Sequence, residues 1–119
     1  MKSAAFLKRG CPFSMKVRLF LLEAGLLDRV DVRAFQNGSD EERAIAEELA
    51  PHFEKVTYPS ARLEDGSYRN GSDDLIAFFA RQYGIDAAAL PTLQDYSTGV
   101  CENLIALFKE NMSLKAKAG

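Results

Sequence analysis

The sequence predicts an α/β domain whose strands and helices follow the order βαβα-ββα, with an extra C-terminal helix. Three patterns predict it. A short apolar run is followed by helical periodicity across residues 3–25, and an alternating run is followed by a capped helix across 29–50. An Asp-Gly turn at 65–66 then separates two short extended runs, and a third periodic helix follows. With 119 residues, 47% of them hydrophobic, one compact domain is the expectation.

The first strand and helix are punctuated by Gly and Pro. The apolar run from Ser3 to Lys8 suits a buried strand, and Gly10 ends it. Pro12 fits the first turn of a helix, where its missing N–H is not needed. Apolar residues then recur at helical spacing until Gly25, which marks the helix end.

The second strand and helix carry equally local signals. Residues 29–35 alternate between apolar and charged side chains, as a half-buried strand does. Ser39 and Glu42, three positions apart, form a capping box at the start of a helix that runs to about Ala50.

The remaining elements are a hairpin and two helices. The runs 60–63 and 67–69 flank the Asp-Gly turn, and a third helix follows Ser72 and ends before Gly84. After an Ala-rich connection, the last helix is expected from about Asp95 to Met112. Its apolar side would carry Val100, Leu104, Ile105, Leu107 and Phe108. The helix-face aromatic residues are expected in the core, namely Phe20, Phe78, Phe79 and Phe108.

Composition excludes several classes of function. The 15 basic and 17 acidic residues give a net charge of −2, which argues against nucleic acid as a partner. No apolar run approaches the length that crosses a bilayer, and the N-terminal segment lacks a secretory pattern. A cytoplasmic protein without a membrane partner is the expectation. Its two widely separated cysteines would be reduced there, and no metal site of recognisable spacing exists.

Cys11 is the candidate reactive residue. It lies immediately before Pro12 at the head of the first helix, where free N–H groups and the helix dipole favour an anion. The thiolate is the reactive form of cysteine, so this position favours nucleophilic chemistry. Lys8, three residues earlier, adds positive charge. Cys101 lacks such surroundings and is expected to pack in the core or stay idle, and His52 is expected at the surface.

Three motifs resemble those of glutaredoxins. The run from Lys8 through Cys11-Pro12-Phe13-Ser14 is similar to their Lys-x-x-Cys-Pro-x-Cys/Ser motif. Thr57-Tyr58-Pro59 is similar to their Thr-Val-Pro, and the run 71–75 to their Gly-Gly-x-Asp-Asp-Leu. The same N-terminal segment also resembles the N-terminal domain of the omega-like, cysteine-type glutathione S-transferases. Both families imply a thioredoxin-like (glutaredoxin-like) fold with a four-stranded mixed sheet.

The resemblance covers residues 3 to 84. It implies a glutathione-binding domain over residues 1–84 and a C-terminal helical extension over 85–119, packed on the same domain. It also implies a site for glutathione. Pro59 would be a cis-proline, and the backbone of Tyr58 would pair with the cysteinyl part of glutathione. Ser72 and Asp73 would hold the γ-glutamyl end at a helix N-terminus, and Lys8 would reach the glycyl carboxylate.

Departures from the family patterns narrow the implied function. Ser14 stands where dithiol glutaredoxins have a second cysteine, so this motif cannot close a disulfide. A monothiol route remains, in which Cys11 forms a mixed disulfide with glutathione taken from a glutathionylated or disulfide substrate. Gly71 replaces the Glu that transferases usually have before the serine, which favours the glutaredoxin type of contact.

Three alternatives stay open. The first is a glutathione S-transferase-like enzyme, although the chain is expected to be too short for a full helical domain. The second is a non-catalytic glutathione-binding module. The third is a homodimer that bridges an iron–sulfur cluster through glutathione, against which Pro12 argues because such proteins have Gly after the cysteine.

Overall fold

The computed structural model describes residues 2–118 of the chain and the side chains of residues 2–111. Its four strands and first three α-helices follow the predicted order, with a 3₁₀ turn, η1 (Ala50–His52), after the second helix. They are β1 (Ser3–Lys8), α1 (Pro12–Glu23), β2 (Val30–Phe35), α2 (Asp40–Leu49), β3 (Ser60–Arg62), β4 (Tyr68–Asn70) and α3 (Ser72–Tyr83). The local signals in the sequence therefore predicted these elements to within a few residues.

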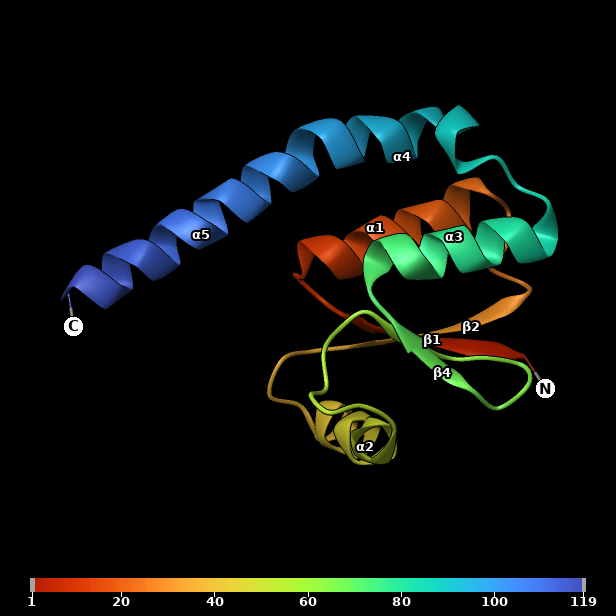
Figure 1. The fold of residues 1–119 in the computed structure, drawn as a ribbon, viewed down its shortest axis with the longest axis horizontal. Helices are drawn as coiled ribbons and strands as arrows, with labels where there is room; N and C mark the ends of the chain where they lie inside the picture. The colour runs from red at the N-terminus through yellow and green to blue at the C-terminus, as the bar shows by residue number, and fades with distance from the viewer. Residues whose placement is uncertain (1, 119) are drawn as a thin grey trace.

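The four strands form one mixed sheet in the order β2-β1-β3-β4. β1 and β2 run parallel, from the pair Ser3 and Val30 to the pair Lys8 and Phe35, while β3 is antiparallel to both β1 and β4. Figure 1 shows α1 and α3 on one face of the sheet and α2 on the other. This arrangement confirms the predicted thioredoxin-like fold.

Side-chain alternation along β1 fills two cores. Ala5 and Leu7 pack with the residues of α1 and α3, whereas Ala4 and Phe6 pack with α2 on the opposite face. A strand covered on both faces must be apolar at every position, which is why β1 reads as a continuous apolar run. The predicted core residues Phe20 and Phe79 are fully buried.

The start of α2 differs slightly from the predicted capping box. Ser39 accepts a hydrogen bond from the Glu42 amide at 3.2 Å, as expected. The Glu42 carboxylate, however, accepts from the Gly38 amide at 2.6 Å, one residue before the cap. The helix start is correctly placed, and an additional loop amide is satisfied.

The C-terminal helical segment begins earlier than predicted. A short 3₁₀ turn, η2 (Ala87–Ala89), leads into α4 (Pro91–Asp95), a π-helical turn η3 (Tyr96–Val100) and α5 (Cys101–Ala118). The prediction of a start near Asp95 was wrong because α4 is capped from elsewhere in the chain. The Glu23 carboxylate, at the end of α1, accepts hydrogen bonds from the Thr92 and Leu93 amides at 3.0 and 2.8 Å.

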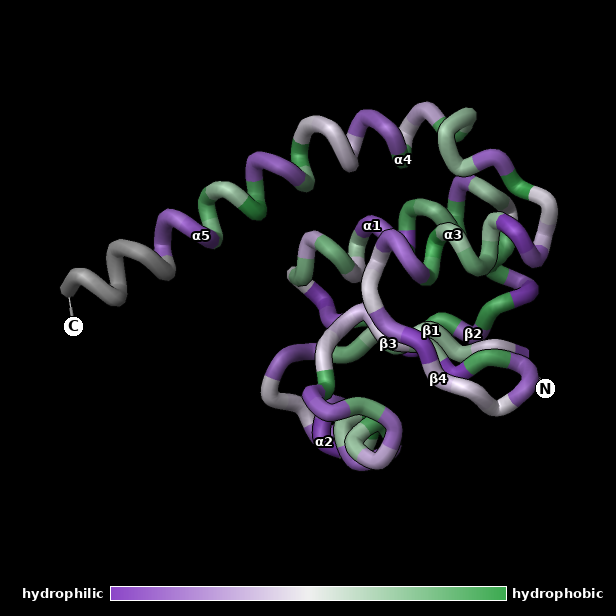
Figure 2. The backbone as a smooth tube through the Cα atoms, viewed as in Figure 1, coloured by the Kyte–Doolittle hydropathy of each residue, from purple (hydrophilic) through white to green (hydrophobic). Residues whose placement is uncertain are grey.

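α5 projects beyond the helices that support its first turn (Figure 1). Leu93 of α4 and Cys101 of α5 are buried, whereas Leu104 and Phe108 are 42% and 64% exposed. The prediction that Phe108 lies in the core was therefore wrong. Helical periodicity identifies an apolar face but does not show what covers it, and Figure 2 shows hydrophobic segments continuing along the projecting helix.

The described residues include no helix long and apolar enough to cross a membrane. Within the same part of the chain, no three His, Cys, Asp or Glu side chains gather as a metal site would require. The division at residue 84 stays a prediction.

Candidate functional site

Cys11 lies where a tight turn joins β1 to α1. The Cys11 amide donates to the Lys8 carbonyl at 3.2 Å across this turn. Gly10 has a φ of +80° in the turn, a conformation that favours glycine. Cys11 is then the N-cap of α1, with Pro12 in the first position, and its side chain makes no capping hydrogen bond. The half-buried thiol thus lies beside the free amides of the first helical turn.

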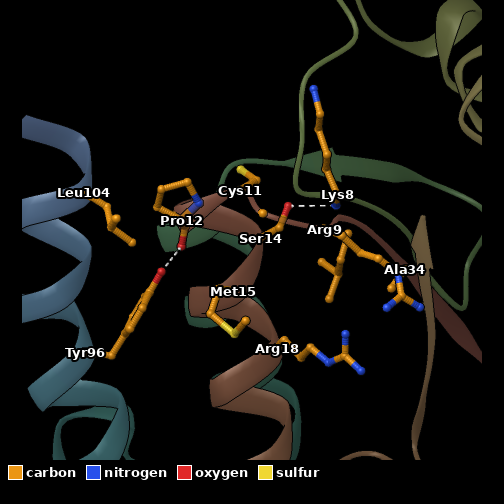
Figure 3. Close-up of a pocket in the computed structure, with 12 residues that line it drawn as sticks. Lys8, Arg9, Cys11, Pro12, Ser14, Met15, Arg18, Ala34, Tyr96 and Leu104 are labelled. Carbon is orange, nitrogen blue, oxygen red and sulfur yellow. Dashed lines mark hydrogen bonds between the residues drawn. The ribbon is translucent and has the colours of Figure 1, made fainter. Parts of the chain in front are cut away.

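A cavity of about 210 Å³ opens beside this thiol (Figure 3). The residues around it come from the end of β1, from the turn that follows it, from α1, from β2 and from the C-terminal helices. They are Leu7, Lys8, Arg9, Gly10, Cys11, Pro12, Ser14, Met15, Arg18, Ala34, Tyr96 and Leu104. Four predicted site residues, Lys8, Cys11, Pro12 and Ser14, therefore line one cavity, whereas Phe13 is exposed on the outside of the helix.

Ser14 has a structural partner. Its side chain is buried, and its hydroxyl accepts a hydrogen bond from the Lys8 amide at 3.1 Å. This contact joins the end of β1 to the first turn of α1, so it fixes the two segments on either side of Cys11. The residue that replaces a second cysteine thus brings to the cavity wall a hydroxyl that is already bonded to the backbone.

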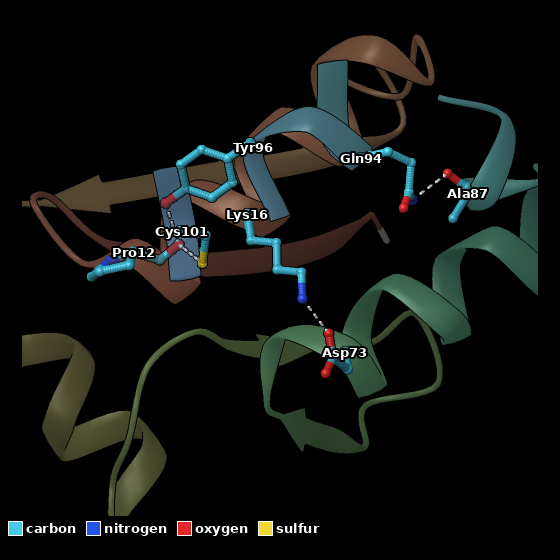
Figure 4. A network of polar contacts seen from close by, with 7 residues as sticks. All are labelled: Pro12, Lys16, Asp73, Ala87, Gln94, Tyr96 and Cys101. Carbon is cyan, nitrogen blue, oxygen red and sulfur yellow. Dashed lines mark hydrogen bonds and ion pairs between the residues drawn. The ribbon is translucent and has the colours of Figure 1, made fainter. Parts of the chain in front are cut away.

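Tyr96 contributes to the site from far along the chain. Its hydroxyl donates to the Pro12 carbonyl at 2.7 Å, and the Cys101 thiol lies 3.9 Å from the same oxygen (Figure 4). Burial raises the pKa of Tyr96 to about 12, with further contributions from Cys101 and from the charge of Cys11. The phenol is therefore neutral and stays a donor to the first turn of α1 at physiological pH. Cys101 is buried, as predicted.

Tyr58 and Pro59 precede β3 at the end of the sheet where β1 finishes. Their peptide bond is cis, as the glutaredoxin resemblance implies. Among the described residues, no group forms a hydrogen bond with the Tyr58 main chain. The Tyr58 ring packs edge-on against Phe35 at 4.6 Å, and its buried hydroxyl lacks a partner in that same part of the chain. Burial and the charge of Glu42 raise the pKa of Tyr58.

Ser72 and Asp73 form the N-terminus of α3. The preceding Gly71 donates its amide to the Pro59 carbonyl at 3.1 Å, which ties this helix start to the cis-proline turn. Ser72 is buried, while Asp73 is exposed and pairs with Lys16 of α1 at 2.6 Å (Figure 4). This second group of predicted residues, which includes Tyr58 and Pro59, does not line the cavity beside Cys11.

Sheet register nevertheless brings both groups to one end of the molecule. β1 ends at Lys8, and Ser60 at the start of β3 pairs with both Phe6 and Asn70. The cis-proline turn, the start of α3 and the Cys11 turn therefore share the same end of the sheet.

Comparison with known families agrees with this geometry. The family described as glutathione S-transferase, N-terminal domain, matches residues 10–82, more than half of the chain. The chain belongs to the glutathione S-transferase N-terminal domain family. A search of curated proteins finds no match. Domains of this family generally bind glutathione, and the predicted family resemblance is confirmed.

The family match ends before the helices that complete the cavity. The matched N-terminal domain supplies Cys11 and Ser14, whereas Tyr96 and Leu104 lie beyond residue 82. Sequence reasoning missed Tyr96, Leu104, Arg9, Met15 and Arg18. Met15 and Arg18 occupy exposed positions of α1, where no local sequence pattern marks a site residue. Tyr96 lies 84 positions from its partner Pro12.

Proposed function

We propose that this protein is a monothiol, glutathione-dependent thiol–disulfide oxidoreductase in which Cys11 forms a mixed disulfide with glutathione. The observation that carries the proposal is what stands at two positions, the N-cap of α1 and its third residue. Cys11 occupies the N-cap position of α1 and lines a cavity, while Ser14, in the position of a second cysteine, is buried and bound to the Lys8 amide. A nucleophile with no resolving cysteine beside it needs an external thiol to complete turnover.

The chemistry has two balanced steps. The Cys11 thiolate attacks the glutathione sulfur of a mixed disulfide, the old sulfur–sulfur bond breaks, and the substrate leaves as a thiolate that takes up a proton. A second glutathione thiolate then attacks the glutathione sulfur bound to Cys11. Oxidised glutathione leaves and the Cys11 thiolate is restored, so one mixed disulfide is reduced at the expense of one free glutathione, and the other half of the oxidised glutathione comes from the substrate.

The cis-proline turn supports a place for glutathione. The unpaired main chain of Tyr58 offers one N–H and one C=O to an extended ligand, as the free edge of a strand does. The N-terminus of α3 at Ser72 offers amide donors to the γ-glutamyl carboxylate. The carboxylate of Asp73, which pairs with Lys16 in this structure, would accept hydrogen bonds from the γ-glutamyl amino group.

The proposal extends to partners and setting. The substrates would be glutathionylated proteins or small disulfides, and the reaction requires a compartment rich in reduced glutathione, such as the cytoplasm. A homodimer belongs to the same proposal, because a second copy would cover the exposed apolar side chains of α5, among them Leu104 and Phe108.

A glutathione-coupled reduction assay tests this function. The native protein should reduce a small glutathione mixed disulfide, and Cys11→Ser should lose about a thousandfold or more of that rate, because the nucleophile is removed. Cys101→Ser is the matched control, since it removes the buried thiol that lies against Pro12. Equal turnover by native protein and Cys11→Ser would show that Cys11 is not the nucleophile.

Family membership favours one competing activity, the conjugation of glutathione to an electrophile. A cysteine nucleophile argues against it, because a covalent disulfide to glutathione blocks the sulfur that conjugation requires. Assay with an activated aryl halide separates the two activities. We expect reduction of the mixed disulfide to dominate, whereas conjugation without reduction would establish the transferase, and the absence of both with retained glutathione binding would establish a non-catalytic module.

A further inference from the structure

The cavity beside Cys11 is positively charged on one side. Lys8, Arg9 and Arg18 are among its twelve lining residues, and no Asp or Glu is. The chain as a whole carries a net charge of −2, so this local excess does not follow from composition. Figure 3 shows the guanidinium groups of Arg9 and Arg18 on one side of the cavity, across from Tyr96 and Leu104.

Among the described residues, these three cations lack the carboxylate partner that four arginines elsewhere in the molecule have. Arg33 and Arg62 pair with Glu48, Arg43 pairs with Asp40 and Arg69 pairs with Asp74. Within the described part of the chain, by contrast, no carboxylate lies within ion-pair distance of Lys8, Arg9 or Arg18. The guanidinium groups of Arg9 and Arg18 lie on the same side of the cavity (Figure 3) and repel one another, and an anion bound between them relieves that repulsion.

The opposite side of the cavity is apolar. Leu104 and Pro12 line it, and the Tyr96 hydroxyl is already engaged with the Pro12 carbonyl. Met15 lies between Tyr96 and Arg18 (Figure 3). A ligand there would contact hydrocarbon and an aromatic ring, with its charged end toward the arginines. This division suits a small molecule with an apolar body and one anionic group.

We infer that the cavity binds the second substrate through an anionic group, in the first instance a carboxylate, and that Arg9 and Arg18 hold this group. The inference rests on the proposed function, because it assigns this cavity to the part of the mixed-disulfide substrate that is not glutathione. The planar guanidinium group forms two parallel hydrogen bonds to a carboxylate, which an ammonium does not. The same charges draw anionic reagents toward the thiol.

Alkylation of Cys11 tests the charge of the cavity without any turnover. Iodoacetate and iodoacetamide transfer nearly the same group to a thiolate, but only iodoacetate is anionic. Peptide mass spectrometry gives the rate of each reagent at Cys11. The rate with iodoacetate divided by the rate with iodoacetamide should fall about three- to tenfold in the Arg9→Gln/Arg18→Gln double variant. Any change in the reactivity of the thiol itself affects both reagents and cancels in the ratio.

Arg43→Gln is the matched control. Arg43 is exposed on α2 and does not line the cavity, so the rate ratio should keep its native value. Arg9 and Arg18 are exposed as well, and their replacement leaves the core intact. An unchanged ratio in the double variant, or an equal fall in Arg43→Gln, overturns the inference.

A pair of substrates separates this inference from the proposed function. The native protein should reduce the glutathione mixed disulfide of mercaptopropionate about five- to tenfold faster, in kcat/KM, than that of uncharged mercaptoethanol, and the double variant should lose this preference. Equal kcat/KM values on the two substrates overturn the inference that the second substrate is anionic, and they are consistent with the proposed oxidoreductase. No turnover of either, with a charge-dependent alkylation ratio, overturns the oxidoreductase and retains the anion site.

Discussion

Ser14 illustrates how a single residue couples local structure to the site. Its buried hydroxyl accepts from the Lys8 amide, and Lys8 and Cys11 lie at the two ends of the turn that this contact braces. Ser14→Ala should reduce the free energy of unfolding by about 1–3 kcal/mol, because a partly buried amide loses its acceptor. Urea denaturation measures this loss.

Ser67→Ala is the control for that prediction. Its hydroxyl donates to Asp65 at the exposed tip of the hairpin, so the free energy of unfolding should change by less than about 0.5 kcal/mol. Equal effects of the two substitutions would contradict the bracing role of Ser14.

Tyr96 gives a prediction for high pH. Its pKa is raised in the folded protein to about 12 from an ordinary 10.0. A raised folded value means that its contribution to stability is complete below pH 10.0 and is lost as the pH climbs toward about 12. Tyr96→Phe should therefore remove the latest phase of tyrosine ionisation, followed by ultraviolet absorbance, and should flatten the fall in stability over that interval. An unchanged ionisation curve would contradict the buried contact with Pro12.

The site was predictable from sequence only where its signals are local. Cys11 with Pro12, and Tyr58 with Pro59, are short motifs whose chemistry depends on neighbouring residues. Tyr96 and Arg18 had no such motif, because one reaches the site through a distant helix and the other is an ordinary exposed position on α1. Which residues line a cavity depends on how distant elements pack together, and the periodicity of a single sequence does not predict that packing.

At the scale of elements, Glu23 connects two helices. Burial would raise the pKa of its carboxyl, but hydrogen bonds from the Leu93 and Thr92 amides outweigh this, and the pKa is lowered from 4.5. The stabilisation is therefore present above pH 4.5 and is lost as the pH falls through the lowered folded value.

Glu23→Gln tests this connection. It removes the negative charge at the N-terminus of α4, so the Thr92 and Leu93 amides should exchange with solvent faster at neutral pH. Amide exchange followed by nuclear magnetic resonance measures this, and Glu47→Gln on α2 should leave both amides unaffected. Acid should bring the native protein toward the behaviour of Glu23→Gln, and identical exchange in the two proteins at neutral pH would contradict the cap.

Most element boundaries followed from the sequence because strands, caps and turns are set by nearby residues. The start of α2 depends on Ser39, and the hairpin depends on the turn at Gly66. The start of α4 depends instead on a carboxylate from α1, and the sequence prediction failed there. A cap supplied across the fold leaves no pattern among adjacent residues.

At the scale of the whole molecule, the C-terminal helical segment is anchored at one end. Leu93 is buried against the main core, whereas Phe108 is largely exposed. Leu93→Ala should lower the free energy of unfolding by about 2–5 kcal/mol through loss of buried surface and the cavity left behind. Phe108→Ala should change the free energy of unfolding of the monomer by less than about 0.5 kcal/mol. Denaturant unfolding of both variants, at a protein concentration low enough to dissociate the proposed homodimer, provides the comparison. A large effect at Phe108 under these conditions would mean that α5 is covered within the monomer.

The most direct test of the central claim is to trap the intermediate on Cys11. The native protein, treated with a glutathione mixed disulfide and quenched with acid, should carry one glutathionyl group on the peptide that contains Cys11, and reduced glutathione should remove it. A glutathionyl group on Cys101 instead, or none on Cys11 while the substrate is consumed, would contradict the proposed mechanism.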